Sequence, residues 1–248
     1  YLLLFFLLSR FIFKFSPKPL ISLYLFLTLS MYNQSFNILR QFIAMTIFLY
    51  AFQYLVKNQA LKYVLIVILG SLIHKSILIT LFLIIIKNLT DNIAKYTSII
   101  LVIFSFVLSN IGKSIIESLV SITAYSNYVY KEVYSESGVG LFINLFLFIL
   151  LVSFYKNFNS NRNRKYYLFC SAICLSLNFF ISNLGMIGRL MVFFKVFYII
   201  SLPIFIEKFK PKAWGFAIEL CMYILFFIYY MVSVSESCFE TSPYVFMN

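Results

Sequence analysis

Two stretches decide the fold: VGLFINLFLFILLVSFY at residues 139–155 and AWGFAIELCMYILFFIYYMVS at residues 213–233. The first has no charged side chain, and the second has only Glu219. At a rise of about 1.5 Å per residue, a helix of either length crosses most or all of a hydrocarbon layer about 30 Å thick. Their apolar residues are continuous and do not recur every three or four positions, so they predict membrane spans and not half-buried helices.

The whole chain has the composition of an integral membrane protein. Of its 248 residues, 62% are hydrophobic and 11% are charged, and the mean hydropathy is +0.95. A soluble domain of this length needs many more charged residues to cover its surface. No polar stretch is longer than the loop 112–138, so we expect a single integral-membrane domain over residues 1–248.

The expected spans follow one another along almost the entire sequence, separated by prolines, asparagines and basic residues. The chain opens on Tyr1 inside an apolar run with no basic region before it, so we expect missing N-terminal sequence and no signal peptide. We predict an all-α fold, a polytopic transmembrane helical bundle of about eight to ten membrane segments. The predicted segments are 1–13, 20–33, 38–56, 63–86, 97–111, 139–156, 167–184, 189–206 and 213–233.

The sequence offers no pattern for a metal or a disulfide. Cys170, Cys174 and Cys221 lie within apolar spans, and Cys238 stands alone in the tail. His74 is the single histidine, which excludes a multi-histidine metal site in this sequence. We therefore expect no metal and no cofactor.

The net charge of +12 predicts the orientation of the chain in the membrane. Lys and Arg collect in short segments between spans, where the positive-inside rule explains them, so we expect no nucleic-acid partner. The basic segments 156–165 and 208–212 should face the cytoplasm. The loop 112–138 and the tail 234–248, where Glu outnumbers Lys and Arg, should face outward.

The same rule leaves a parity problem. Lys62 should be cytoplasmic, so two simple crossings at 63–86 and 97–111 would return the chain to the wrong side before the loop 112–138. Either 63–86 is a broken or re-entrant hairpin that enters and leaves on the cytoplasmic face, or 97–111 does not cross. We favour the hairpin because the polar sequence HKS at 74–76 interrupts the apolar run, and charged groups at membrane depth persist where they line a polar cavity.

Two arginines lie at matching depths in different spans. Arg40 is 17 positions before Lys57, and Arg189 is 18 positions before Glu207. These separations correspond to about 25 and 27 Å of helix, which places both guanidinium groups near the outer boundary of the hydrocarbon layer. An arginine at this depth either anchors its helix at the lipid headgroups or lines a site.

His74 completes the set. It lies 12 residues after Lys62 and 13 before Lys87, so the tip of a hairpin around His74 rises about 18–20 Å, to a depth where it can meet both arginines. Guanidinium groups hold phosphate oxygens in a bidentate fork, and imidazole can accept a proton from a sugar hydroxyl. The set fits transfer of a sugar from a lipid pyrophosphate to an acceptor hydroxyl. A histidine that hydrogen-bonds to a neighbouring helix is the alternative.

The motifs around these residues resemble those of one known family. NILRQFIA at residues 37–44 is similar to the N-x-x-R-Q-x-x-A signature of the EpsG family of membrane proteins, which is related to Wzy-type polysaccharide polymerases. SLIHKSIL at residues 71–78 resembles that family's segment ending in F-H-x-S-A-L, with Ile73 in place of the Phe and Ile77 in place of the Ala.

Two later motifs extend the resemblance over roughly residues 20–246. GRL at residues 188–190, followed by Pro203, is similar to the family's late R-L span that ends at a proline. Pro243-Tyr244 matches its closing motif. The order and spacing of the motifs carry the resemblance, since each of them alone is short.

The resemblance implies a polymerase-type membrane glycosyltransferase of the cytoplasmic (inner) membrane, used in exopolysaccharide or capsule biosynthesis. Its substrate would be an undecaprenyl-pyrophosphate-linked oligosaccharide, and its partners membrane lipid and other polysaccharide-synthesis membrane proteins. The candidate catalytic residues are Arg40, His74 and Arg189, and the candidate substrate-binding residues are Asn37, Gln41, Lys75 and Ser76.

Two other functions remain open. A flippase or other transporter of lipid-linked oligosaccharide would also need buried cations in a cavity, but this chain lacks the inverted repeats and paired Gly/Pro-broken helices common in transporters. A non-catalytic subunit of a polysaccharide synthesis complex is the other function.

Overall fold

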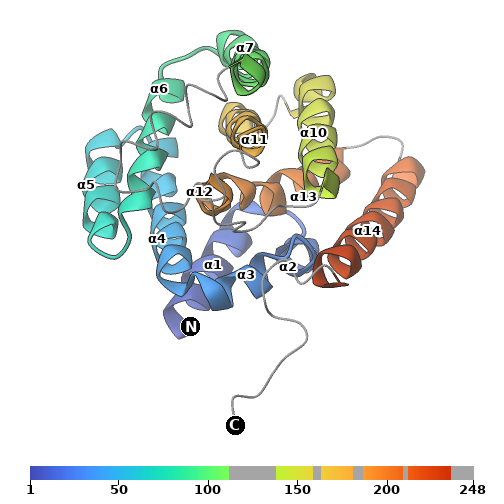
Figure 1. Ribbon diagram of the computed structural model, residues 1–248, viewed down its shortest axis with the longest axis horizontal. Helices are drawn as coiled ribbons and strands as arrows, with labels where there is room; N and C mark the ends of the chain where they lie inside the picture. The colour runs from blue at the N-terminus through green and yellow to red at the C-terminus, as the bar shows by residue number, and fades with distance from the viewer. Residues whose placement is uncertain (112–137, 159–162, 181–186, 209–211, 236–248) are drawn as a thin grey trace.

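In the computed structural model, the described residues are 1–111, 138–158, 163–180, 187–208 and 212–235, and every regular element among them is a helix (Figure 1). The all-α prediction is therefore confirmed. In chain order the elements are α1 (Leu2–Phe15), α2 (Pro19–Thr28), α3 (Met31–Asn37), α4 (Leu39–Val56), α5 (Ala60–Ser71), the 3₁₀ helix η1 (Lys75–Phe82), α6 (Leu83–Lys87), α7 (Asp91–Ile111), α10 (Gly138–Ser153), the 3₁₀ helix η2 (Tyr155–Phe158), α11 (Arg164–Asn178), α12 (Ile187–Lys195), α13 (Tyr198–Lys208) and α14 (Lys212–Ser235).

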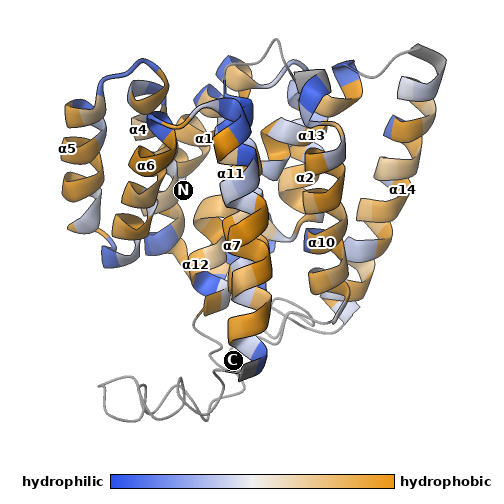
Figure 2. Cartoon of the chain, turned by 90° about the horizontal axis from the view of Figure 1, so that it is seen from above, coloured by the Kyte–Doolittle hydropathy of each residue, from blue (hydrophilic) through white to orange (hydrophobic). Residues whose placement is uncertain are grey.

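Helix length and hydropathy make the chain a multi-pass membrane protein. Four segments among the described residues are long and apolar enough to cross a membrane, and shorter apolar helices accompany them. Figure 2 shows that hydrophobic residues cover the helices along their length, while hydrophilic residues gather at helix ends and loops. The predicted count of eight to ten segments is not established by length, because several predicted spans are divided. The four long spans are Leu39–Val56, Asp91–Asn110, Ile187–Lys208 and Trp214–Ser235.

The α12–α13 segment is the central element of the bundle (Figure 1). Across an 18-residue apolar stretch of this segment, 89% of the residues are buried inside the protein, against 22% in the corresponding stretches of the peripheral helices α7 and α14. Pro203 inside α13 cannot donate to the carbonyl of Ile199, four residues earlier. The buried hydroxyl of Ser22 in α2 donates to that carbonyl instead, at 2.6 Å. A side chain from a neighbouring helix thus satisfies the backbone group that the proline leaves free.

Contacts at both ends of paired helices give their directions. Lys18, just before α2, forms an ion pair with Glu219 near the start of α14. Ser30, where α2 passes into α3, hydrogen-bonds Ser233 near the end of α14 at 2.9 Å. The α2–α3 segment and α14 therefore run parallel.

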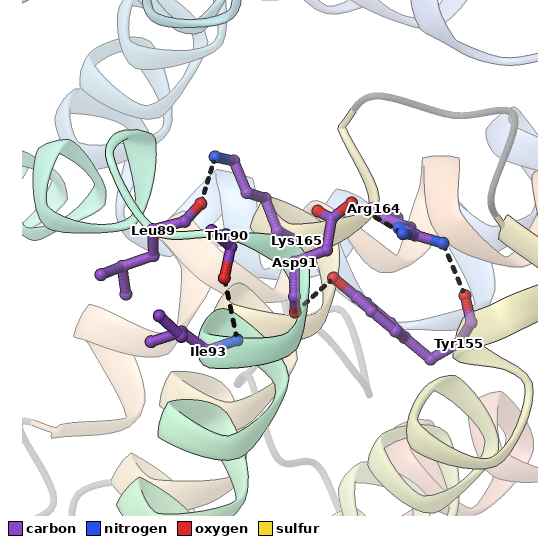
Figure 3. Close-up of polar contacts among 7 residues, drawn as sticks. All are labelled: Leu89, Thr90, Asp91, Ile93, Tyr155, Arg164 and Lys165. Carbon is purple, nitrogen blue, oxygen red and sulfur yellow. Dashed lines mark hydrogen bonds and ion pairs between the residues drawn. The ribbon is translucent and has the colours of Figure 1, made fainter.

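The helices α7 and α11 also run parallel, from a polar cluster at their first residues (Figure 3). Arg164 forms a 2.6 Å ion pair with Asp91, and its guanidinium lies 4.8 Å from the centre of the Tyr155 ring. At the other end, the rings of Phe106 and Phe179 lie 5.3 Å apart. Because Asp91 begins α7, its carboxylate also faces the positive end of the helix dipole.

A continuous set of contacts joins the basic helix ends on one side of the bundle. Lys57, after α4, is close enough to act electrostatically on Lys14 at the end of α1. The ammonium of Lys87 lies 3.4 Å from the carbonyl of Asn58, and that of Lys165 donates to the carbonyl of Lys87 at 2.8 Å. We call this side, which holds Lys14, Lys57, Lys87, Arg164 and Lys165, the basic face.

The segment from α5 to α6 is a hairpin whose two ends lie on the basic face. Tyr63 in α5 donates to the carbonyl of Thr80 in η1 at 2.6 Å, and Asn58 lies beside Lys87. The chain therefore turns back between Ser71 and Lys75, as the sequence predicts. Because α7 then begins at the basic face and is long enough to cross, a cytoplasmic basic face, as the sequence predicts, would be compatible with the outward loop 112–138 without the non-crossing alternative for 97–111.

Candidate functional site

Arg40, His74 and Arg189 come from three elements that meet on the side opposite the basic face. Arg40 lies in the first turn of α4, and Arg189 in the first turn of α12. His74 is the N-cap of η1, at the tip of the hairpin. Since α4, η1 and α12 all pack against one another, the helix starts and the hairpin tip form one cluster.

The two arginines act electrostatically on the histidine. His74 is half-buried in the turn between α5 and η1, outside the long spans. Burial lowers the pKa of its imidazole below the ordinary value, and the positive charges of Arg40 and Arg189 lower it further. Both arginines, which the sequence places at the depth of His74, are therefore within electrostatic reach of the imidazole, and their charges favour its neutral form.

Gln41 holds the two arginine-bearing helices together. Its side chain is 1% exposed, and its amide nitrogen donates to the backbone carbonyl of Arg189. The two residues are 148 positions apart in the sequence. Gln41, a candidate for substrate contact, is thus placed to fix the relative position of Arg40 and Arg189.

Ser76 makes the corresponding contact with His74. Its hydroxyl oxygen lies 2.6 Å from Nδ1 of the imidazole, and its backbone N–H donates to the same nitrogen at 3.4 Å. A side chain that accepts a hydrogen bond from the first turn is the usual N-cap arrangement. The remaining two candidates, Asn37 at the end of α3 and Lys75 beside His74, are exposed.

The arginines of the cluster have no acidic partner among the described residues. Among the described residues, the ion pairs are Lys18 with Glu219 and Arg164 with Asp91, so no carboxylate neutralises Arg40 or Arg189. The Nε of Arg189 is buried and has no hydrogen-bond partner in this part of the chain. A buried N–H of a cation without an acceptor is costly, and an anionic ligand would satisfy it.

The comparison with known families agrees with the motifs around this cluster. The model of the EpsG family matches residues 1–246. The chain belongs to the EpsG family. No match was found among curated proteins or among solved structures. Membership makes this a multi-pass membrane protein connected with polysaccharide biosynthesis.

One buried cation of this EpsG-family chain was missed in the sequence analysis. Lys195, six positions after Arg189 in α12, is 3% exposed, and its ammonium lies 3.4 Å from the hydroxyl of Tyr229 in α14. The signal was present, because Lys195 is the single charged residue between Arg189 and Glu207. Lys195 places an amino group in the buried centre of the bundle, at the end of α12, whose first turn holds Arg189.

Other parts of the prediction lie outside the described residues. They include almost all of the loop 112–138 and the tail 234–248, with the closing motif at 243–244. Within the described residues, no group of three His, Cys, Asp or Glu side chains could hold a metal ion. A metal-free reaction stays a prediction of the sequence.

Proposed function

We propose that this EpsG-family protein is a polymerase-type membrane glycosyltransferase that acts on undecaprenyl-pyrophosphate-linked repeat units in exopolysaccharide or capsule biosynthesis. The observation that carries the proposal is the pair of arginines beside His74, which have no acidic partner among the described residues. An uncompensated pair of guanidinium groups at a helix-rich, membrane-embedded cluster suits a diphosphate, whose oxygens each fork can bind in a bidentate manner.

The proposed orientation puts this cluster on the outer side of the cytoplasmic membrane. The basic face, at the opposite ends of the helices, would face the cytoplasm according to the positive-inside rule. The hairpin enters from the basic face, and its tip carries His74 toward the starts of α4 and α12. Repeat units on the outer leaflet would therefore reach the arginines without crossing the bundle.

The proposed reaction is displacement at the anomeric carbon of the donor. The bond between that carbon and the diphosphate oxygen breaks, and its electron pair leaves with the diphosphate. The acceptor hydroxyl oxygen forms the new bond to the anomeric carbon, and its proton passes to the released terminal phosphate, since such a phosphate titrates near pH 6. Arg40 and Arg189 bind the diphosphate and stabilise the negative charge that grows on it as the bond breaks.

The test replaces each arginine by lysine, which keeps the charge and loses the fork. Loss of one charge-assisted hydrogen bond of about 1.5–3 kcal/mol reduces activity by about 10- to 100-fold. The assay is complementation of a deletion strain, with polymer length read on gels and expression checked by immunoblot. Arg10→Lys is the matched control, because Arg10 is an exposed arginine of α1 whose guanidinium lies 5.7 Å from the Tyr50 ring centre.

The outcomes separate the possible functions. Arg40→Lys and Arg189→Lys should each reduce long polymer by about 10- to 100-fold, while lipid-linked repeat units accumulate on the outer side of the membrane. Accumulation on the inner side would instead indicate a flippase. If both variants support normal polymer, the arginines are interfacial anchors, for which Lys serves about as well as Arg, and the proposed site is refuted.

A further inference from the structure

The imidazole of His74 has two nitrogens with different surroundings. Nδ1 faces Ser76, which approaches it with both the hydroxyl oxygen at 2.6 Å and the backbone N–H at 3.4 Å. Nε2 is on the opposite edge of the ring and has no hydrogen-bond partner among the described residues. The position of the proton on the ring therefore depends on whether the contacts with Ser76 need a lone pair or a proton on Nδ1.

A backbone N–H can only donate a hydrogen bond, so it requires a lone pair on Nδ1. A proton on Nδ1 would point at the N–H of Ser76, because both groups would then be donors. The hydroxyl of Ser76 is compatible with either role, and it donates to Nδ1 when the nitrogen is unprotonated. The two contacts are satisfied together only by the neutral tautomer that carries its proton on Nε2.

The charges around the ring keep it in this neutral form. Arg40 at the start of α4 and Arg189 at the start of α12 both act on His74, and no described acidic residue forms an ion pair with either. A protonated ring would add a third cation to the cluster. The single lone pair of the neutral ring is directed at Ser76, which leaves none for a substrate hydroxyl.

We propose that His74 acts as a hydrogen-bond donor to the diphosphate, through Nε2–H, and that Ser76 is the positioning residue that fixes this tautomer. The inference rests on the proposed function, and it replaces the proton-accepting role that the sequence suggests for the imidazole. The cluster then consists entirely of donors: two guanidinium groups and one imidazole N–H. Such a set is complementary to the acceptor oxygens of a diphosphate, and it binds the charge that grows on the leaving group.

The first experiment compares three substitutions of His74 in the full chain. The amide nitrogen of Gln can occupy the place of Nε2, whereas that of Asn reaches only the place of Nδ1. His74→Gln should keep polymer synthesis within about tenfold of the native level, and His74→Asn and His74→Ala should lose about 100-fold or more, in the range of a lost catalytic donor. Equal loss in His74→Gln and His74→Ala would overturn the donor role.

The second experiment reads the tautomer directly. Since His74 is the single histidine of this sequence, ¹⁵N-histidine labelling gives the signals of one imidazole. We expect an unprotonated Nδ1 and a protonated Nε2 in the native protein, and the same tautomer still in excess in Ser76→Ala, because this variant loses the hydroxyl but keeps the backbone N–H that requires the lone pair. Ser71→Ala is the matched control, because the exposed Ser71 hydroxyl donates, within the described part of the chain, only to the carbonyl of Ile68 in its own helix, at 2.6 Å. A protonated Nδ1 in the native protein would overturn the inference.

The results distinguish this inference from the function on which it rests. If the arginine-to-lysine variants lose polymer while His74→Gln is as inactive as His74→Ala, the glycosyltransferase site stands and the donor role fails. If the arginine variants and His74→Ala all make normal polymer, both fail.

Discussion

Gly70, in the last turn of α5, packs closely against η1, the other arm of the hairpin, and against α4. A Cβ at this position would lie 2.7 Å from Cδ1 of Ile77 in η1 and 3.2 Å from Cγ2 of Ile47 in α4. Ile77 is fully buried, so its terminal methyl has little room to move. We therefore expect Gly70→Ala to destabilise the protein although alanine is the better helix former.

The magnitude follows from two opposing effects. Replacing a helical Gly by Ala stabilises a helix by about 1 kcal/mol, and overpacking a filled interior costs about 1–3 kcal/mol. The net loss of about 1 kcal/mol corresponds to a fall in apparent Tm of about 2–4 °C for a chain of this size. Gly138→Ala is the matched control, because a Cβ on Gly138 at the start of α10 meets no atom of the described residues within 4 Å. We expect it to leave the Tm unchanged or to raise it slightly.

The assay is thermal unfolding of purified protein in detergent, followed by loss of monodisperse material, with a double-mutant cycle. Ile77→Val removes the Cδ1 methyl and alone costs about 0.5–1.5 kcal/mol. In the presence of Ala at position 70 the same change should cost less, since it removes the conflicting atom, and the coupling should be about 1 kcal/mol. Equal Tm shifts for the Gly70 and Gly138 variants, with additive effects of Ile77→Val, would refute the close approach of the hairpin.

Further predictions concern the hairpin and the site. Tyr63→Phe should destabilise the protein by about 1 kcal/mol in the same assay, because it removes the buried hydrogen bond that joins the two arms; an unchanged Tm would contradict this. In a titration followed by NMR, the pKa of His74 should lie below its ordinary value of 6.5, and Arg189→Gln should raise it by removing a positive charge; no upward shift would show that the arginine does not act on the ring. In a cysteine-free background, cysteines at Asn58 and Lys75 should be labelled from opposite sides of the membrane, and labelling from one side would exclude the proposed hairpin orientation. Polymer synthesis should continue in EDTA, and a loss of synthesis that Mg²⁺ restores would count against a metal-free site.

Continuous apolar runs allowed most helices to be placed from the sequence. The predicted span 38–56 is α4 and 213–233 is α14, each within two residues at either end. The divided spans were harder to predict. Residues 20–33 break at Ser30, which has φ 59°, although neither Gly nor Pro stands there. Because Ser30 bonds Ser233 in α14, tertiary contact decides the break.

For the site, the sequence predicted which residues belong to it but not which side chains they contact. The motifs and depths selected Arg40, His74 and Arg189, and the structure brings both arginines within electrostatic reach of His74. The same motifs offered Gln41 and Ser76 as substrate-binding residues, but their polar atoms face Arg189 and His74. A sequence motif identifies which side chains belong to a site, whereas the side chain each one contacts depends on helices that lie far away along the chain.

The order of synthesis along the chain determines when the hairpin can pack against its neighbours. Its arms emerge from the ribosome before α7, α10 and α11, and α12 follows later still. With 12 residues, α5 is too short to span a hydrocarbon layer of about 30 Å without neighbours. A nascent chain that ends before α12 therefore has a hairpin without its central packing partner, and it exposes HKS at 74–76 to lipid or to membrane proteases. The cluster around His74 is completed late in biogenesis, so chains interrupted before residue 189 should be cleared and not stored in the membrane.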